Sequence, residues 1–133
     1  MVSENRKIKT DLVEAVERFA QRISTPLTEV VILNFQPDFQ LTTGKSHLIY
    51  RVLQELIGNA LKHAQCSSVF VKFERQDNWL IIQVEDDGSG MSENQIETGL
   101  HSIKERVSAL SGTVAIQSSE GMGTTVKIQI EIG

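Results

Sequence analysis

The sequence predicts an α+β fold: a two-layer α/β sandwich in which about three helices cover one face of a mixed, mostly antiparallel sheet. Two observations predict this class. The period of the apolar residues changes along the chain in the order α-β-α-β-β-α-β-β. Several strand segments also alternate between apolar and polar residues, which is typical of a sheet with one covered face. A length of 133 residues suits one domain with a single core.

The first half of the chain contains two expected helices around one strand. Residues 7 to 23 place apolar side chains at steps of three and four, which indicates an amphipathic helix: Leu12, Val16, Phe19 and Ile23. The segment "EVVILNF" (29 to 35) is apolar and β-branched, as in a strand. Residues 46 to 64 are expected to form a long helix despite Gly58, because apolar side chains repeat on one face: Leu48, Val52, Leu56 and Ala60.

The second half contains four expected strands, at residues 68–75, 78–86, 113–119 and 124–132. The first two are separated by a short turn around Gln76 and Asp77, which predicts an antiparallel hairpin. A glycine-punctuated loop then leads to a helix at 100 to 112, and Gly112 is expected to close that helix as its C′ residue.

The segment "LTTGKSHLIY" (41 to 50) places Gly-Lys-Ser before the long helix, as a phosphate-binding P-loop does. Such a loop needs a glycine five residues before Gly44, because its backbone N–H groups wrap around the phosphates. The residue at that position is Phe39, and the nearby Pro37 has no N–H group. The segment is therefore interpreted as a helix start whose N-cap is one of two threonines: Thr42 or Thr43.

Composition excludes several classes of protein. A net charge of -4 without a basic block argues against nucleic acid as the main partner. No apolar stretch reaches the roughly 20 residues that span a membrane, and "MVSENRKIKT" is not a signal peptide. The single cysteine, Cys66, rules out an internal disulfide and suits a reducing cytoplasm.

Polar residues on the long helix form the first candidate cluster. Four of them fall within one arc at the border of the apolar face: Glu55, Asn59, Lys62 and His63. An ordinary solvated helix surface is the alternative interpretation. The amide oxygen of Asn59 could ligate Mg²⁺, which takes few protein ligands and prefers phosphates and waters. The ammonium group of Lys62 could pair with a phosphate.

The segments "EDDGSGM" and "EGMGTT" form the other two clusters. Asp86 and Asp87 end a strand and point to opposite faces, so one site is not expected to use both. Alone, each segment is explained equally well by a turn. A helix that starts after Gly99 aims free N–H groups at whatever the preceding loop encloses, which favours a phosphate. Together, the three clusters outline a nucleotide site.

Four segments resemble the sequence boxes of the GHKL ATPases. "ELIGNALKHA" is similar to the N box in its sensor histidine kinase form, and "DDGSGM" is similar to the G1 box. "TGLHSIKERV" resembles the G2 box and the following helix, and "EGMGTTVKIQI" resembles the last Gly-x-Gly-Thr box. They occur in the family's order over residues 10 to 132. The short loop and the "IKERV" helix look most like kinases that partner LuxR-type (NarL-like) response regulators.

The resemblance implies a Bergerat fold that binds ATP with Mg²⁺. Asp86 would hydrogen-bond the adenine amino group, and Thr124, together with Thr125, would complete this contact through water. Asn59 would hold Mg²⁺, and Glu55 would be the catalytic acid that orients the site or its water. The resemblance implies further nucleotide contacts from eight residues: Lys62, His63, Gly88, Gly90, Met91, Gly99, Leu100 and His101.

Two positions depart from the family pattern. Glu97 occupies the place of a G2-box glycine, and Asp87 occupies a place that is often Asn. A carboxylate at position 97 could repel the γ-phosphate. The lid over ATP, expected at residues 88 to 99, would therefore have an unusual phosphate nest.

The family's phospho-accepting histidine has no counterpart here, because none of the three histidines lies in an acidic-flanked His motif: His47, His63 and His101. The expected function is therefore the ATP-binding catalytic domain of a two-component sensor histidine kinase. It would transfer the γ-phosphoryl group of ATP to a histidine on a dimerisation domain absent from this chain, and it would not phosphorylate itself. Residues 1–9 would be the tail of the dimerisation region, and residues 10–133 the histidine kinase-like ATPase domain.

The implied partners are the dimerisation domain of the same kinase and a downstream response regulator. The fragment itself is expected to be a cytoplasmic monomer without membrane contact, even where the full-length kinase is anchored in a membrane. Two alternatives remain open. One is a free-standing GHKL serine kinase of the anti-sigma-factor type. The other is a nucleotide-binding docking module without kinase activity, which Glu97 favours.

Overall fold

The structure is a computed structural model of the chain. It describes the backbone of the following residues: 2–24, 29–34, 41–63, 68–88, 100–118, 121 and 123–131. The helices within these ranges are α1 (Val2–Ile23), α2 (Thr43–His63) and α4 (His101–Ala109). The strands are β1 (Glu29–Asn34), β2 (Ser68–Gln76), β3 (Trp79–Asp86), β4 (Gly112–Ser118) and β5 (Thr124–Glu131).

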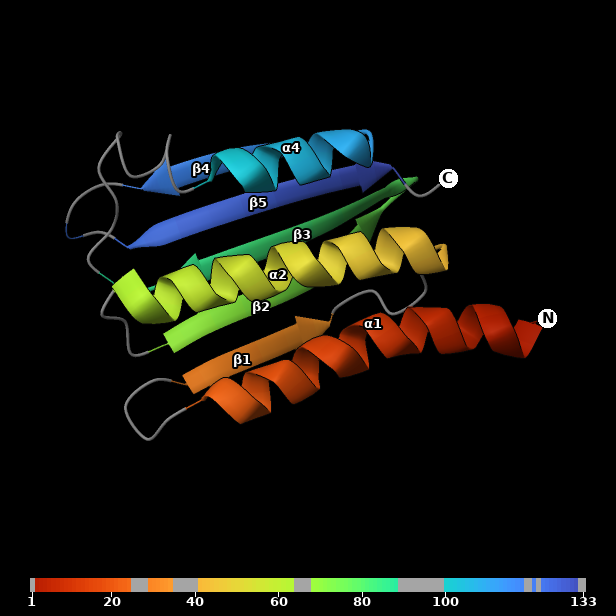
Figure 1. Ribbon diagram of the computed structural model, residues 1–133, viewed down its shortest axis with the longest axis horizontal. Coiled ribbons are helices and arrows are strands. Elements are labelled where there is room, and N and C mark those ends of the chain that lie inside the picture. Colours follow the sequence, from red (N-terminus) through yellow and green to blue (C-terminus); the bar gives the residue numbers. More distant parts are fainter. Residues whose placement is uncertain are drawn as a thin grey trace.

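The five strands form one sheet in the order β1-β2-β3-β5-β4. The β1–β2 pair is parallel, and the three other pairs are antiparallel. The predicted hairpin joins β2 to β3, and its turn contains Asp77 in the left-handed region at φ 54°. The helices α1, α2 and α4 lie side by side on one face of this sheet (Figure 1). The predicted two-layer sandwich with a mixed, mostly antiparallel sheet is therefore confirmed.

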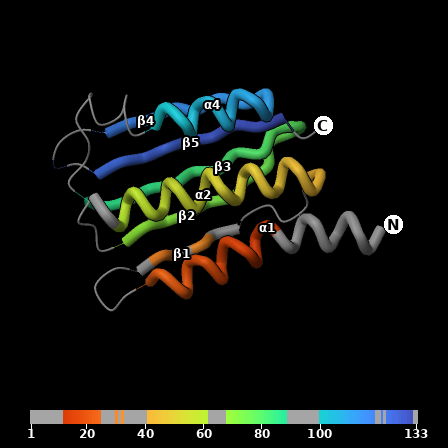
Figure 2. Tube along the Cα trace, in the orientation of Figure 1, coloured from red at the N-terminus to blue at the C-terminus, as the bar shows by residue number. Residues whose placement is uncertain are grey.

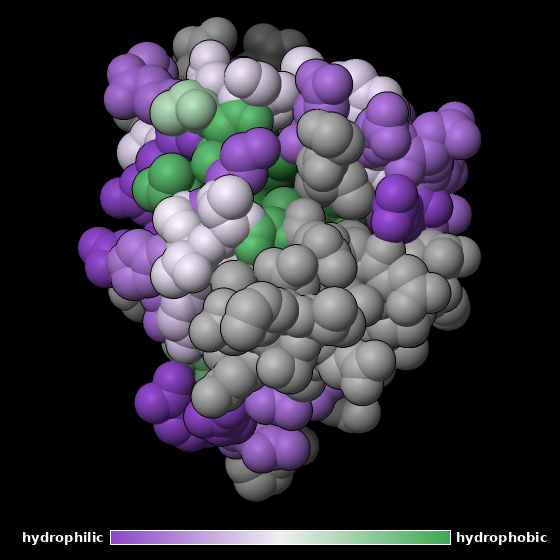
Figure 3. All heavy atoms as spheres, turned by 90° about the vertical axis from the view of Figure 1, so that its right-hand side faces the viewer, coloured by the Kyte–Doolittle hydropathy of each residue, from purple (hydrophilic) through white to green (hydrophobic). Residues whose placement is uncertain are grey.

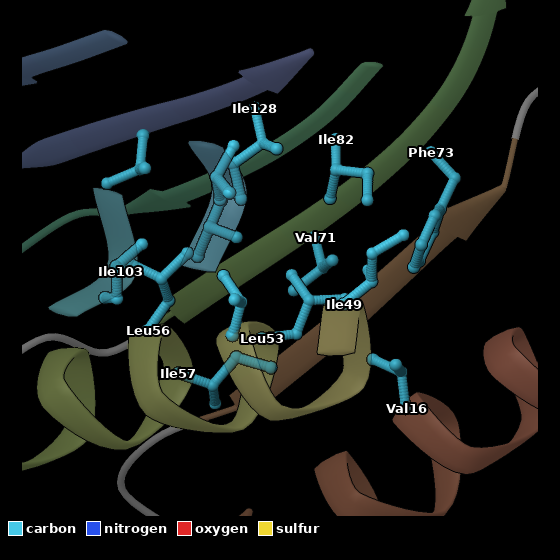
Figure 4. Packing of buried hydrophobic residues seen from close by; sticks show 14 of the residues in the cluster. Val16, Ile49, Leu53, Leu56, Ile57, Val71, Phe73, Ile82, Ile103 and Ile128 are labelled. Carbon is cyan, nitrogen blue, oxygen red and sulfur yellow. The ribbon is translucent and has the colours of Figure 1, made fainter. Parts of the chain in front are cut away.

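The core lies between α2 and the covered face of the sheet. Alternate residues of β2 are fully buried there, which is the period of two expected of a strand: Val69, Val71 and Phe73. Leu53 and Ile57 of α2 have no exposed surface, and Leu53 points at the sheet (Figure 4). The apolar face predicted for α2 is therefore the buried one, although it is wider than the predicted repeat because Ile49, Leu53 and Ile57 also belong to the core.

The start of α2 agrees with the interpretation of "LTTGKSHLIY" as a helix start. The hydroxyl of Thr42 accepts a hydrogen bond from the backbone N–H of Lys45 at 3.2 Å, which is an N-cap bond. The helix begins at Thr43, as an N-cap at Thr42 requires, and so extends three residues beyond the expected repeat of 46 to 64; Gly44 lies inside its first turn. Figure 3 views this end of the molecule, where the coloured atoms are mostly hydrophilic around a smaller apolar area. No phosphate loop is formed by these residues.

The end of α4 differs from the prediction. The helix ends at Ala109, and the left-handed residue that follows it is Ser111, at φ 57°, rather than Gly112. Gly112 instead begins β4, where an added Cβ atom would lie 2.6 Å from the backbone oxygen of Gln129. The prediction of Gly112 as the C′ residue was therefore wrong, because this glycine allows β4 to approach β5.

None of the helices in the described part of the chain combines the length and the apolar character needed to cross a membrane.

Candidate functional site

The predicted clusters meet at one end of the sheet. In Figure 2 the C-terminal end of α2, the end of β3 and the starts of α4 and β5 all lie at the left. The elements therefore bring Asn59, Asp86, Leu100 and Thr124 to the same end of the molecule, opposite the N-terminal end of α2.

Asp86 is the last residue of β3 and pairs in register with Thr124, the first residue of β5. Residues opposite each other in an antiparallel ladder project from the same face of the sheet. The Asp86 Oδ1 atom accepts a hydrogen bond from the backbone N–H of Gly88 at 2.9 Å. Thr124 is a buried polar side chain, at 6% exposure, in a core that is otherwise apolar. The pair thus offers a carboxylate and a hydroxyl at the boundary between core and solvent.

Burial raises the pKa of Asp86 above the ordinary range of an aspartate, because desolvation disfavours the charged carboxylate. The backbone N–H groups of Gly88 and Thr124 donate to the carboxylate and oppose this change. The neighbouring negative charge of Asp87 raises the pKa further. Asp86 is therefore a desolvated acceptor that gains from a ligand able to donate a hydrogen bond to it.

Asp87 has a different task. Its Oδ1 atom accepts a hydrogen bond from the backbone N–H of Ser68 at 2.9 Å. A longer backbone bond of 3.4 Å runs from the Asp87 N–H to the Ser68 carbonyl. The two adjacent aspartates thus have separate partners, and Asp87 fixes the start of β2 beside the end of β3.

Gly123 allows the backbones of β5 and β3 to meet behind Asp86. Its φ is +76°, and an added Cβ atom would lie 2.3 Å from the backbone oxygen of Asp86. Gly121 has a similar φ of +80°, but an added Cβ atom there would contact nothing within 4 Å. Both positions favour glycine for their dihedral angles, and Gly123 also requires it for space.

Ser118, the last residue of β4, was not identified from the sequence. Its hydroxyl donates to the carbonyl oxygen of Gly123 at 3.1 Å and lies 2.8 Å from the hydroxyl of Thr124. These bonds fix Thr124, the first residue of β5, from the neighbouring strand β4, while β3 pairs with β5 on its other edge. The pairing of β4 with β5 that places Ser118 here is a tertiary feature without a local sequence signal.

Glu55 of α2 is bound to α4. Its Oε1 atom accepts a hydrogen bond from the hydroxyl of Ser102 at 2.9 Å, and its Oε2 atom accepts one from Arg106 at 2.7 Å. Ser102 and Arg106 were not selected from the sequence, because their partner lies 47 and 51 residues away.

The remaining predicted residues differ in their placement. Asn59 is half-buried on α2, and within the described part of the chain no hydrogen bond to its amide is found. The side chain of Leu100 belongs to the core, so this residue can offer a ligand only its backbone. His101 is exposed and lies 3.0 Å from Glu105. Thr125 follows Thr124 on β5 and therefore projects from the other face of the sheet.

Several predicted contacts lie outside the described residues. These are the side chains of Lys62 and His63, together with Gly90, Met91 and Gly99. The same holds for Glu97 and for all of the expected lid except Gly88.

A metal site made of protein side chains alone is not found in the described part of the chain, where no three acidic, histidine or cysteine residues gather. Mg²⁺ does not need such a cage, because it retains waters and binds phosphate oxygens. The half-buried amide of Asn59, unpaired among the described residues, fits a cation of this kind.

These segments match known proteins. The family model of the histidine kinase-, DNA gyrase B-, and HSP90-like ATPases matches residues 44–133. The sequence is 39% identical to the sensor histidine kinase ComP of Bacillus subtilis over 89 residues, which are 63% of this chain and 12% of ComP. It is 26% identical to the sensor histidine kinase LiaS of the same organism over 132 residues, 97% of this chain and 35% of LiaS. The chain thus spans about a third or less of these relatives.

A solved structure has the same fold. The histidine kinase domain from the blue-light activated histidine kinase of Erythrobacter litoralis EL346 superposes with a TM-score of 0.78 at 21% identity. The match covers 94% of this chain and 61% of that chain. The two-layer sandwich is therefore shared by both proteins.

The close approach of Gly123 to the backbone of Asp86 predicts that substitutions at Gly121 and Gly123 differ in their cost to stability. Gly121→Ala should cost about 1 kcal/mol of unfolding free energy, because alanine is strained at positive φ. Gly123→Ala should cost at least about 1 kcal/mol more, since its Cβ atom would also meet the Asp86 carbonyl. Urea denaturation of both variants measures the difference. Equal losses would show that the backbones are not in contact.

The raised pKa of Asp86 predicts a pH-dependent stability. Protonation favours the folded state here, so the contribution of Asp86 is fully present below the ordinary aspartate pKa of about 3.9. It is lost as the pH rises through the raised folded-state pKa. Relative to Asp86→Asn, the wild type should therefore lose unfolding free energy as the pH rises from about 4, and the difference should then level off. Urea denaturation across this range measures it. A constant difference would contradict the assigned desolvation.

Proposed function

Because the chain belongs to the family of histidine kinase-, DNA gyrase B-, and HSP90-like ATPases, we propose that it is the ATP-binding catalytic domain of a two-component sensor histidine kinase. The family match confirms the resemblance seen in the sequence. The observation that carries the proposal is the desolvated carboxylate of Asp86, held against Gly123 at the end of β3. The relatives that are named sensor histidine kinases support the kinase branch of the family.

Asp86 would recognise the adenine ring. An ionised carboxylate only accepts hydrogen bonds, and the exocyclic amino group of adenine donates them. Guanine presents a carbonyl oxygen at the corresponding position, which the carboxylate would repel. Thr124 lies opposite Asp86 in the ladder and would complete the contact through a water molecule.

The phosphates would lie between α2 and the start of α4. The first N–H groups of α4 lack intrahelical partners and carry the positive end of the helix dipole. Asn59 would hold Mg²⁺ together with the phosphate oxygens, and the bound ion would neutralise their charge. Lys62 and the backbone of residues 99–101 would add donors for the phosphates, as the family resemblance implies.

The transfer step would be carried out mainly by positioning and charge neutralisation. A nitrogen of the acceptor histidine would attack the γ-phosphorus, and the bond to the bridging oxygen would break as ADP leaves. Glu55, four residues before Asn59 on α2, would orient the site through its hydrogen bonds to Ser102 and Arg106. The acceptor would lie on a separate domain, for which residues 1–9 would form the connecting tail. Helix α1 runs without a break from Val2 to Ile23, which suits a helical connection.

The wider context follows from this proposal. The partners would be the dimerisation domain and a response regulator of the LuxR (NarL-like) type. Neither nucleic acid nor a membrane surface would be bound by this domain. The fragment would act as a monomer in the cytoplasm, where ATP is available, including in a membrane-anchored kinase.

Binding of Mg-ADP tests the assignment of Asn59. Asn59→Ala should weaken Mg-ADP binding by about tenfold or more, because the ion loses its protein ligand. Without Mg²⁺, the wild type and the variant should bind ADP almost equally. Isothermal titration calorimetry measures both conditions.

Lys45→Ala is the matched control on the same helix. It lies 14 residues from Asn59, or about 21 Å along an α-helix, beyond the screening length of about 10 Å. Its affinity should stay within about twofold of wild type. Tight binding that depends on neither Mg²⁺ nor Asn59 would contradict the site, as would loss of binding in Lys45→Ala alone.

A phosphorylation assay tests whether this chain binds ATP while the phosphate-accepting histidine lies on another domain. Incubated with radiolabelled Mg-ATP, this chain should bind the nucleotide but acquire no acid-labile phosphohistidine, because its acceptor lies elsewhere. Autoradiography after neutral gel electrophoresis detects the label. Stable phosphohistidine on this chain would contradict the proposal of a separate acceptor domain and would indicate that one of the three histidines of this chain is the acceptor.

A further inference from the structure

The carboxylate of Glu55 joins two helices that are far apart in the sequence. One oxygen accepts from Ser102 at 2.9 Å, and the other accepts from Arg106 at 2.7 Å. The two donors are four residues apart and so share one face of α4. Both oxygens of a single carboxylate therefore bind the same face of the neighbouring helix.

The apolar contacts of α4 attach it to the sheet. Ile103 and Val107 are buried almost completely and belong to the main core. Apolar packing is not directional, so it resists detachment more than it resists sliding or rotation. Hydrogen bonds with defined geometry, such as those to Glu55, set how α4 lies along α2.

The first turn of α4 has little support of its own. Its N-cap residue, Leu100, makes no side-chain cap bond, and the turn contains no acidic residue. The negative charge of Glu55 reaches this turn from α2 through Ser102, the second residue of the helix. A negative charge near a helix N-terminus is favourable. Glu55 of α2 therefore stabilises the first turn of α4 in place of an N-cap side chain or an acidic residue in that turn.

We propose that Ser102 and Arg106 are positioning residues: they bind Glu55 and thereby hold the first turn of α4 at a fixed place beside the end of α2 that carries Asn59. This inference rests on the proposed function, because that first turn and Asn59 would face the phosphates. The adenine end of the site, built by β3 and β5 around Asp86, does not depend on this link. Loss of the link should therefore weaken phosphate binding and leave adenine binding unchanged.

The test compares Mg-ADP with adenosine as ligands in NMR titrations. Arg106→Gln should weaken Mg-ADP binding by about five- to tenfold, the range expected for a partly exposed charge-assisted bond. Adenosine affinity should stay within about twofold. Glu55→Gln should have a similar effect, and the double variant should be no weaker than the single ones, because the two changes remove one interaction.

Two further variants act as controls. Lys127→Gln removes the same charge from an exposed position of β5, on the face of the sheet away from the helices, and should leave both affinities unchanged. Arg106→Lys keeps the charge and should restore part of the Mg-ADP affinity, which a purely steric role of Arg106 would not explain. Equal weakening of adenosine and Mg-ADP would overturn the proposal, as would an unchanged Mg-ADP affinity in Arg106→Gln.

Hydrogen exchange in the nucleotide-free chain tests the positioning role without depending on nucleotide binding. The first backbone hydrogen bond of α4 runs from the N–H of Lys104 to the carbonyl of Leu100 at 3.0 Å. Hydrogen exchange at the Lys104 amide should accelerate about fivefold in both Glu55→Gln and Arg106→Gln. An unchanged exchange rate would overturn the positioning role even if no nucleotide bound. A wild type that binds neither ligand, with exchange accelerated as expected, would contradict the proposed function alone.

Discussion

The packing of α2 against the centre of the sheet is the constraint on which the molecule depends. Its apolar face is buried over β2 and β3, and Leu53 and Ile57 are wholly enclosed there. The three helices in the described part of the chain all lie on the same face of the sheet (Figure 1). The axis of α2 therefore sets which residues reach each end of the sheet. Its polar N-cap goes to one end, and Glu55 and Asn59 go toward the other.

The candidate site is built from two parts with different physics. One part is rigid backbone: β3 and β5 meet at Asp86 and Gly123 with no room for a Cβ atom. A carboxylate held there is fixed by the sheet itself. The other part is α4, whose place along α2 is set by side-chain hydrogen bonds that are partly exposed. Such contacts are weaker than core packing, so the end of the site at Asp86 is the firmer one.

The sequence predicted those features that depend on residues close together in the chain, such as helix capping and strand alternation. The N-cap could be narrowed to Thr42 or Thr43 because such a bond spans only three residues, and the structure selects Thr42. The alternation of apolar and polar residues in β2 likewise matches its alternating burial. Gly112 was misassigned because its reason is the approach of β5, which no neighbouring residue reveals.

The same limit applies to the site. Asp86 was predicted as a site residue, and Gly123 lies in the glycine-rich segment "EGMGTT" that was predicted to belong to the site. Ser118 is placed by strand pairing, and Arg106 by a helix contact across 51 residues, so neither carried a signal in the sequence. Thr125 shows the converse case, since a neighbour of Thr124 in the chain lies on the opposite face of the sheet.

The hydrogen bond between the hydroxyls of Ser118 and Thr124 can be donated in only one direction. A carbonyl oxygen has no proton to give, so the bond between Ser118 and Gly123 uses the one hydroxyl proton of Ser118. The short contact between the two hydroxyls must then be donated by Thr124. With its proton committed inward, Thr124 presents lone pairs alone, beside a carboxylate that also presents lone pairs. The side chains of Asp86 and Thr124 therefore both act as hydrogen-bond acceptors, and a molecule that binds to them must supply the protons.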